Sequence, residues 1–212
     1  MIQEILTHLP GLLAVYAICA LGLLSPGPNV LSVIGTAMDA GRGKAMAVAW
    51  GVSLGTGIWA SCTVVGLTAL MTRYAELALA IRIAGGCYLL WLAFKSFRAA
   101  LGSRELNSVP SRGNVSFRAA FARGLAIQMT NPKAALTWAS IMTLVIRPDV
   151  PSWVSIAVVL GCTIVSAFGH SLYALAFSST HVVLGYRRLR RMIEGALALF
   201  FCFAGVRLIV AR

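Results

Sequence analysis

Three long stretches of this 212-residue sequence contain no aspartate, glutamate, lysine or arginine. They run from Ile5 to Met38, from Ala45 to Thr72 and from Val150 to Tyr186. Each is long enough to cross the hydrocarbon core of a bilayer, which takes about 20 residues in an α-helix. Only 11% of all side chains are charged, whereas soluble domains average about 25%. The sequence therefore predicts an all-α integral membrane protein.

Three further apolar segments, 77–94, 119–146 and 192–211, contain one or two charged residues each. With these segments the prediction is six transmembrane helices. The first apolar region continues past the length of a signal peptide and has no lysine or arginine before it, so we expect it to stay in the protein.

A polar stretch, residues 101–117, separates two halves of the predicted bundle and is interpreted as a cytoplasmic connector. Residues 1–100 then form a first three-helix repeat, and residues 118–212 form a second. Because three is an odd number of crossings, the halves would lie in opposite orientations. This is an inverted repeat, an arrangement that is common in secondary transporters.

The formal net charge of +12 comes from basic residues that gather in alternate predicted loops. Those loops contain Arg42 and Lys44, then Lys95, Arg98, Arg104, Arg112 and Arg118, and finally Arg187, Arg188, Arg190 and Arg191. The positive-inside rule places these loops in the cytoplasm and both termini outside. The charge thus indicates membrane topology, with contact to acidic lipids as a second effect, and we predict no nucleic-acid partner.

Two proline motifs interrupt the first and fourth spans, namely Ser25-Pro26-Gly27-Pro28-Asn29 and Thr130-Asn131-Pro132-Lys133. Proline lacks an amide hydrogen, so each proline frees the carbonyl four residues earlier. Inside a membrane such a carbonyl needs a partner from protein, water or a ligand. Asn131 before Pro132 fits a helix N-cap, and Gly27-Pro28 or Ser25-Pro26 fits the same pattern. Kinks that only shape helix packing are the alternative interpretation.

Two helix starts near mid-membrane would present free amide groups and positive dipole ends to one site for an anion. Lys133 adds a full positive charge beside the second start. Freed carbonyls and nearby polar side chains could hold a donor such as an ammonium group, so the site suits a zwitterion. The candidate site comprises Ser25, Pro26, Gly27, Pro28, Asn29, Gln128, Thr130, Asn131, Pro132 and Lys133.

Five segments together resemble the lysine exporter (LysE) family of bacterial amino-acid exporters, which includes homoserine and threonine exporters. They are LLSPGPNVL, GRGKAMAVAWGVSLG, IRIAGGCYLLWLAFKSFR, FRAAFARGLAIQMTNPKAALTW and EGALALFFCFAGVRL. The resemblance implies a secondary active exporter of amino acids or related small zwitterionic metabolites in the bacterial inner membrane, coupled to proton antiport. Its partners would be an amino acid, protons and membrane lipid. Assembly into a homo-oligomer stays open.

The sequence departs from the family at Asn29, where many members have aspartate, and in TWASIMTLVIRPDV, which follows NPKAAL. These departures leave the substrate and the proton carrier undefined. No carboxylate is expected within a span, because Asp39 and Glu194 lie at predicted cytoplasmic ends. Asp39 and His170 are the candidates for proton coupling, beside Lys133 and the substrate itself, since histidine titrates near neutral pH. A packing hydrogen bond is the alternative role for His170.

Other functional classes fit the sequence less well. An enzyme would need paired ligands or an activated nucleophile, and Ser171 is turned away from its neighbour His170 by helix geometry. The five cysteines form no CxxC pair, so we predict no metal site and no cofactor. A passive channel, or a membrane subunit without its own transport activity, could use the same broken helices and stays as the alternative.

Overall fold

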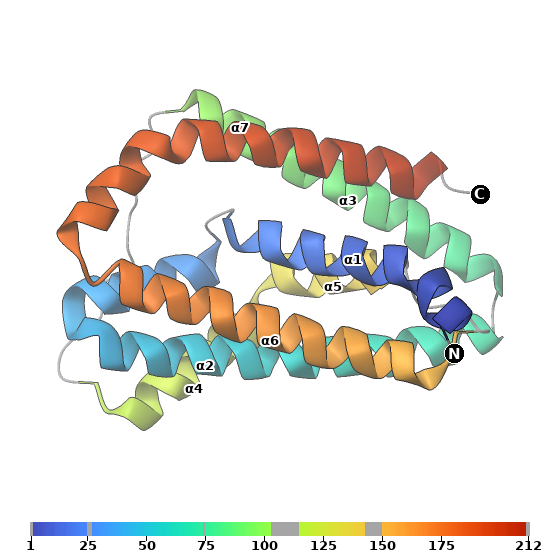
Figure 1. Cartoon of the computed structure of the whole chain (residues 1–212), viewed down its shortest axis with the longest axis horizontal. Coiled ribbons are helices and arrows are strands. Elements are labelled where there is room, and N and C mark those ends of the chain that lie inside the picture. Colours follow the sequence, from blue (N-terminus) through green and yellow to red (C-terminus); the bar gives the residue numbers. More distant parts are fainter. Residues whose placement is uncertain (1, 25–26, 74, 103–114, 143–149, 211–212) are drawn as a thin grey trace.

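The computed structural model describes residues 2–24, 27–73, 75–102, 115–142 and 150–210, and every regular element in them is an α-helix (Figure 1). The helices are α1 (Ile2–Leu24), α2 (Pro28–Arg73), α3 (Ala75–Leu101), α4 (Phe117–Thr130), α5 (Pro132–Met142), α6 (Ser152–Ala176) and α7 (Thr180–Val210). The all-α prediction is confirmed. Both proline motifs lie at helix boundaries, since α2 begins at Pro28 and α5 begins at Pro132.

α2 turns back on itself at Gly41, whose φ of 82° and ψ of 168° are not helical. Glycine adopts such a positive φ at little cost because it has no Cβ. A short helix therefore follows the first break, and a long helix returns through the bundle (Figure 1). The predicted first loop is wrong, because one glycine makes the turn and Arg42 and Lys44 already belong to the second helical segment.

Four helical stretches among the described residues are long and apolar enough to cross a membrane. They are Leu6–Leu24, Pro28–Gly66, Ser152–Ala176 and Arg188–Val210. With 14 and 11 residues, α4 and α5 are each shorter than the bilayer core and would span it only as a broken pair. The predicted connector falls between the end of α3 and the start of α4, and residues 103–114 lie outside the described residues.

Small residues let the central helices approach closely. α2 packs most extensively against α4 and α6, and α3 packs against α7. A Cβ on Gly124 of α4 would overlap the Val48 carbonyl of α2, and a Cβ on Gly51 would overlap the Phe121 carbonyl in return. Close backbone contact of this kind is the usual role of small residues between membrane helices.

One face of α6 is exposed and the opposite face is buried. Ile156, Leu160, Ile164, Phe168 and Leu172 follow each other at four-residue spacing and are all exposed. The buried face includes Val154, Val158, Cys162, Ser166 and His170. An exposed stripe of large apolar side chains suits lipid, so the buried, partly polar face is the one that faces the bundle.

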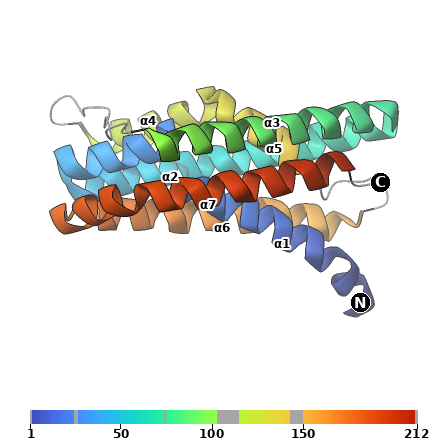
Figure 2. The same ribbon diagram turned by 90° about the horizontal axis from the view of Figure 1, so that it is seen from above.

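The two ends of the bundle differ in charge. The Gly41 turn, the end of α3, the start of α4 and the start of α7 lie at one end, and these segments contain most of the described basic residues (Figures 1 and 2). The start of α1 and the end of α7 lie at the other end.

Glu194 lies deeper than the sequence suggested. It is only 3% exposed and belongs to the apolar stretch Arg188–Val210 of α7. The expectation that no carboxylate lies within a span is therefore wrong. α7 begins at Thr180 and continues through its basic residues without interruption, so the helix carries Glu194 inside the bundle.

Candidate functional site

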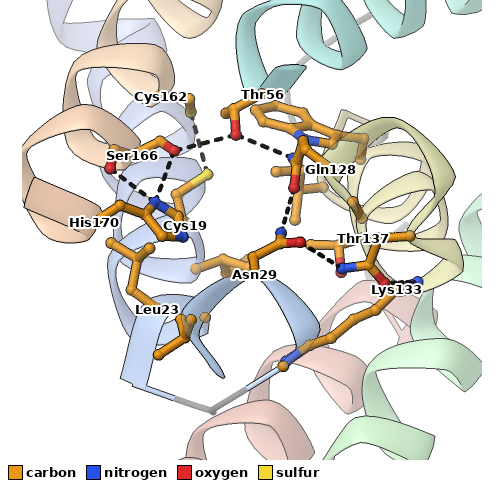
Figure 3. A pocket seen from close by; sticks show the side chains of 18 residues that line it. Cys19, Leu23, Asn29, Thr56, Gln128, Lys133, Thr137, Cys162, Ser166 and His170 are labelled. Atoms are coloured by element: carbon orange, nitrogen blue, oxygen red, sulfur yellow. Dashed lines mark hydrogen bonds between the residues drawn. The ribbon is translucent and has the colours of Figure 1, made fainter. Parts of the chain in front are cut away.

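Both helix breaks line one cavity of about 110 Å³ near the centre of the bundle (Figure 3). Gly27, Asn29 and Val30 come from the first break, and Asn131, Lys133 and Ala134 come from the second. α1, α4 and α6 close the remaining walls, with His170 on the side opposite Lys133. The volume is several times the space that one water needs, so the cavity has room for a small polar molecule.

Each break starts a helix as the sequence predicted. The carbonyl oxygen of Gly27 accepts the first hydrogen bond of α2, from the Leu31 amide at 3.0 Å. At the second break, Asn131 Oδ1 accepts from the Lys133 amide at 3.0 Å. Asn131 is therefore the N-cap of α5, and Pro132 occupies the first helical position, where its missing amide hydrogen costs nothing.

Two carbonyls near the breaks accept hydrogen bonds from side chains. Trp59 Nε1 donates to the Gln128 carbonyl at 3.2 Å, and Tyr173 donates to the Leu23 carbonyl at 3.0 Å. The Gln128 carbonyl also accepts from the Asn131 amide at 3.4 Å, so both side-chain contacts support carbonyls at the ends of broken helices. The prediction that the freed Gln128 carbonyl holds an ammonium group is therefore not supported, because a tryptophan occupies it.

A directed chain of hydrogen bonds joins four helical segments across the cavity wall (Figure 3). Asn131 Nδ2 donates to Asn29 Oδ1 at 3.2 Å, and Asn29 Nδ2 donates to Gln128 Oε1. Gln128 Nε2 donates to Thr56 Oγ1 at 3.0 Å, and Thr56 Oγ1 donates to the Val52 carbonyl at 3.1 Å. Each amide side chain in the chain acts as donor and as acceptor, so the two breaks are held in one arrangement.

The polar chain continues into α6. Thr56 Oγ1 lies 3.1 Å from Ser166 Oγ, and Ser166 Oγ lies 3.2 Å from His170 Nδ1. His170 is 4% exposed and Ser166 is 5% exposed. Neutral side chains thus connect His170 on α6 with the second break, where Lys133 follows Asn131.

Lys133 brings its charge to the first break as well as the second. A Cβ built on Gly27 would lie 3.6 Å from Lys133 Nζ, so the ammonium group of Lys133 lies beside the N-terminus of α2. A cation next to a helix N-terminus repels the positive end of the dipole. An anion bound between them would relieve this repulsion, because both features attract negative charge. Tyr88 of α3 supports the segment by donating to the Lys133 carbonyl at 3.1 Å.

Several residues of the predicted site do not line the cavity or lie outside the residues that the structure describes. Ser25 and Pro26 lie outside the described residues. Thr130 is exposed, and its hydroxyl donates to the Ala126 carbonyl at 2.7 Å, so it does not line the cavity. Asp39 is also exposed and is absent from the cavity wall, close to the Gly41 turn. Pro28 and Pro132 begin their helices and contribute through the backbone.

The structure adds residues that the sequence interpretation missed. They are Thr56, Trp59, Ser166, Cys19 and Cys162, and the two thiol sulfurs lie 3.3 Å apart on α1 and α6. One signal was available in the sequence, because Cys162, Ser166 and His170 recur every four residues. That spacing puts all three on one face of a helix. Thr56 and Trp59 had no comparable signal, since their roles depend on the position of Gln128.

A helical membrane protein whose broken helices meet at a cavity with both polar and apolar walls is the class that fold and site define. The chain belongs to the LysE type translocator family, whose model matches residues 20–212. This match confirms the resemblance to the LysE family that the sequence motifs indicated.

Relatives with similar sequences cover most of the chain. It is 28% identical to the threonine efflux protein of Escherichia coli (strain K12) over 204 residues, which are 94% of this chain and 98% of that protein. The threonine efflux protein of Salmonella typhi is 28% identical over 90% of this chain and 93% of its own length. The homoserine/homoserine lactone efflux protein of Salmonella typhi is 33% identical over 60% of this chain and 61% of its own length. No solved structure shows a significant match to the chain.

Proposed function

We propose that this protein exports amino acids or related small zwitterions across the bacterial inner membrane as a secondary active transporter. The observation that carries the proposal is that both helix breaks, with Lys133, line one central cavity. Broken helices that meet at mid-membrane are a common way for transporters to form a substrate site. Relatives named as threonine and homoserine efflux proteins support the substrate class.

The site favours a carboxylate on the side of Lys133. Its ammonium group lies beside the N-terminus of α2, and α5 begins at the residue before it. A substrate carboxylate there would accept charge-assisted hydrogen bonds, which contribute about 1.5–3 kcal/mol each. We expect the polar chain through Asn29, Gln128 and Thr56 to hold the rest of a small substrate.

An inverted repeat supports alternating access about this site. The broken pair α4–α5 would correspond to α1 with the short first segment of α2, and α6 and α7 would correspond to the long segment of α2 and to α3. The packing of α2 on α6 and of α3 on α7 suits such a symmetry. In many transporters one repeat moves against the other around a fixed site.

We propose that the basic end of the bundle faces the cytoplasm, which places both termini outside. Six crossings agree with the start of α1 and the end of α7 lying at the same end (Figure 1). Export from the cytoplasm would then be driven by protons that enter in exchange. Of the two coupling candidates, His170 lines the cavity and Asp39 does not.

Counterflow in proteoliposomes tests the proposal. Vesicles that contain the purified protein are loaded with unlabelled L-threonine or L-homoserine and diluted into a trace of the labelled compound. A carrier accumulates label transiently above its outside concentration, and unlabelled substrate added outside saturates the effect. Equilibration without accumulation would support a channel, and label entry no faster than in protein-free vesicles, for every proteinogenic amino acid and homoserine, would overturn the proposal.

A further inference from the structure

His170 presents its imidazole to the cavity from the wall opposite Lys133 (Figure 3). It lies on α6, one turn after Ser166 and two turns after Cys162, and these residues also line the cavity. Only 4% of the His170 surface is exposed. A buried ionisable side chain in a membrane-spanning helix is costly unless it has a function or a partner.

The hydrogen bonds of His170 define its tautomer. Nδ1 lies 2.9 Å from the Ser166 carbonyl oxygen and 3.2 Å from Ser166 Oγ. A carbonyl oxygen can only accept, so Nδ1 carries the proton of the neutral ring. Nε2 is then an acceptor, and within the described part of the chain no hydrogen bond to it is found.

Several other acceptors around the cavity already accept a hydrogen bond. Asn29 Oδ1, Gln128 Oε1 and Asn131 Oδ1 each accept a hydrogen bond from a neighbour. The carbonyls of Gln128 and Leu23 accept from Trp59 and Tyr173. None of the described residues that line the cavity is a carboxylate. For an ammonium group held in the cavity, Nε2 of His170 is therefore a side-chain acceptor that is available without breaking any of these hydrogen bonds.

The titratable groups that face His170 come from three helices. Lys133 of α5 lies across the cavity, Cys19 belongs to α1, and Cys162 lies on α6. Tyr173 follows His170 on α6, with its hydroxyl bound to the Leu23 carbonyl. The lining residues from α2 and α4, such as Asn29 and Gln128, are uncharged. Glu194 and Lys95 lie outside the described cavity wall and interact electrostatically with Lys133. Among the described lining residues, Lys133 therefore supplies the cationic side of the cavity and His170 a neutral one.

We propose that His170 Nε2 accepts a hydrogen bond from the ammonium group of the exported zwitterion, and that a proton competes with this group for the same nitrogen. The inference rests on the proposed export function and assigns the second end of the substrate. A proton on Nε2 turns the acceptor into a donor and makes the ring cationic, so the ring then repels the ammonium group.

This competition gives the exchange that an antiporter requires. With the site open to the outside, a proton binds His170 and the amino acid leaves. With the site open to the cytoplasm, the next amino acid binds, and the proton leaves Nε2 for the cytoplasm. One proton enters for each zwitterion exported, and no covalent bond forms or breaks other than the N–H bond of the imidazole.

Replacing the histidine in two ways separates accepting from titrating. His170→Gln supplies an amide oxygen that accepts but does not titrate near neutral pH, whereas His170→Phe keeps a ring and has no acceptor. Ser171→Ala is the matched control, because Ser171 follows His170 on α6 and is not among the residues that line the cavity. Each variant is purified, checked for a monodisperse size-exclusion profile, and reconstituted for counterflow and for accumulation driven by a pH gradient, with labelled L-threonine and L-homoserine.

We expect His170→Gln to keep counterflow within about threefold of wild type and to lose accumulation driven by the pH gradient. His170→Phe should raise the half-saturating concentration at least tenfold, and Ser171→Ala should keep gradient-driven accumulation. Accumulation by His170→Gln equal to wild type, or a wild-type half-saturating concentration for His170→Phe, would overturn the inference. Absence of counterflow in the wild-type protein would instead refute the export function itself.

The wild-type protein provides a second test that needs no variant. The half-saturating concentration for counterflow should rise about tenfold per pH unit once the medium is acidic enough to protonate His170. A concentration that stays constant between pH 8 and pH 3.5 would contradict competition between the proton and the ammonium group.

Discussion

Lys133 combines two roles at one residue, which a substitution can separate. Its backbone amide is bound by the Asn131 cap, and its side-chain cation lies beside Gly27. Lys133→Ala keeps the first contact and removes the second. Since a charge-assisted hydrogen bond contributes about 1.5–3 kcal/mol, we expect the initial rate of labelled amino-acid efflux from cells to fall at least tenfold at equal membrane abundance.

Thr130→Ala is the control for that loss. Thr130 belongs to the same sequence motif, but its side chain is exposed, and its hydroxyl donates to the Ala126 carbonyl of its own helix. Efflux by this variant should stay within about twofold of wild type. Equal efflux by Lys133→Ala and wild type would remove Lys133 from the substrate site.

Asn29 has to be an amide in the observed network, because it donates to Gln128 and accepts from Asn131. An ionised Asn29→Asp side chain would oppose the Gln128 oxygen with no hydrogen between them, at a cost of about 1–3 kcal/mol for an unsatisfied buried group. We expect efflux by Asn29→Asp to fall several-fold below wild type at pH 8. It should recover relative to wild type at pH 5, because the protonated acid donates again.

Asn29→Ala serves as the comparison for the pH effect, since alanine has no proton to gain. Its efflux relative to wild type should stay low at both pH values. An Asn29→Asp protein that matches wild type at every pH would show that the amide donor is dispensable.

The sequence predicted the residues that act through the backbone better than those that act through side chains. Asn131 as a cap and Pro28 and Pro132 as helix starts follow from local chemistry. Thr56 and Ser166 could not be found in this way, because their roles depend on which helices the fold brings to Gln128. Thr130 was wrongly included for the same reason, since one residue along a helix turns the side chain to another face.

At the scale of helices, the contact between α2 and α4 is limited by glycine. A Cβ on Gly124 would overlap backbone atoms of Val48, which cannot move without shifting α2. Overpacking of this kind costs about 1–3 kcal/mol, so Gly124→Ala should lower the melting temperature of the detergent-solubilised protein by several degrees.

Gly66→Ala is the matched substitution on α2, because nothing lies within 4 Å of a Cβ at that position. Its melting temperature should equal that of the wild-type protein. If both alanine variants have the same melting temperature, close contact between α2 and α4 does not contribute to stability.

The elements themselves were mostly visible in the sequence, whereas their junctions were not. Long uncharged stretches predicted the helices because a membrane allows little else. The turn at Gly41 was mistaken for a loop, since a single glycine with positive φ carries no length signal. Glu194 was placed at a helix end for a related reason, because α7 begins well before its apolar stretch and carries the carboxylate inward.

At the scale of the whole molecule, the unequal charge of the two bundle ends predicts the topology. Alkaline phosphatase functions only outside the cytoplasm, so we expect it to be active when it is fused after Arg212. A cysteine introduced at Arg42, near the Gly41 turn, should react in intact cells only with a membrane-permeant maleimide. Labelling of that cysteine by an impermeant maleimide would reverse the proposed orientation.

We propose that the substrate binds between the two helix breaks. Because the native Cys19 lines that cavity, the rate at which its thiol is alkylated reports whether substrate occupies the cavity. In a variant with Cys19 as its single cysteine, reconstituted in vesicles that perform counterflow, N-ethylmaleimide would be added with and without a mixture of homoserine and the proteinogenic amino acids other than cysteine. If substrate binds there, the mixture should slow alkylation of Cys19, and Lys133→Ala should abolish this protection. Alkylation at the same rate with and without the mixture, in vesicles that still exchange labelled amino acid, would contradict substrate binding between the helix breaks.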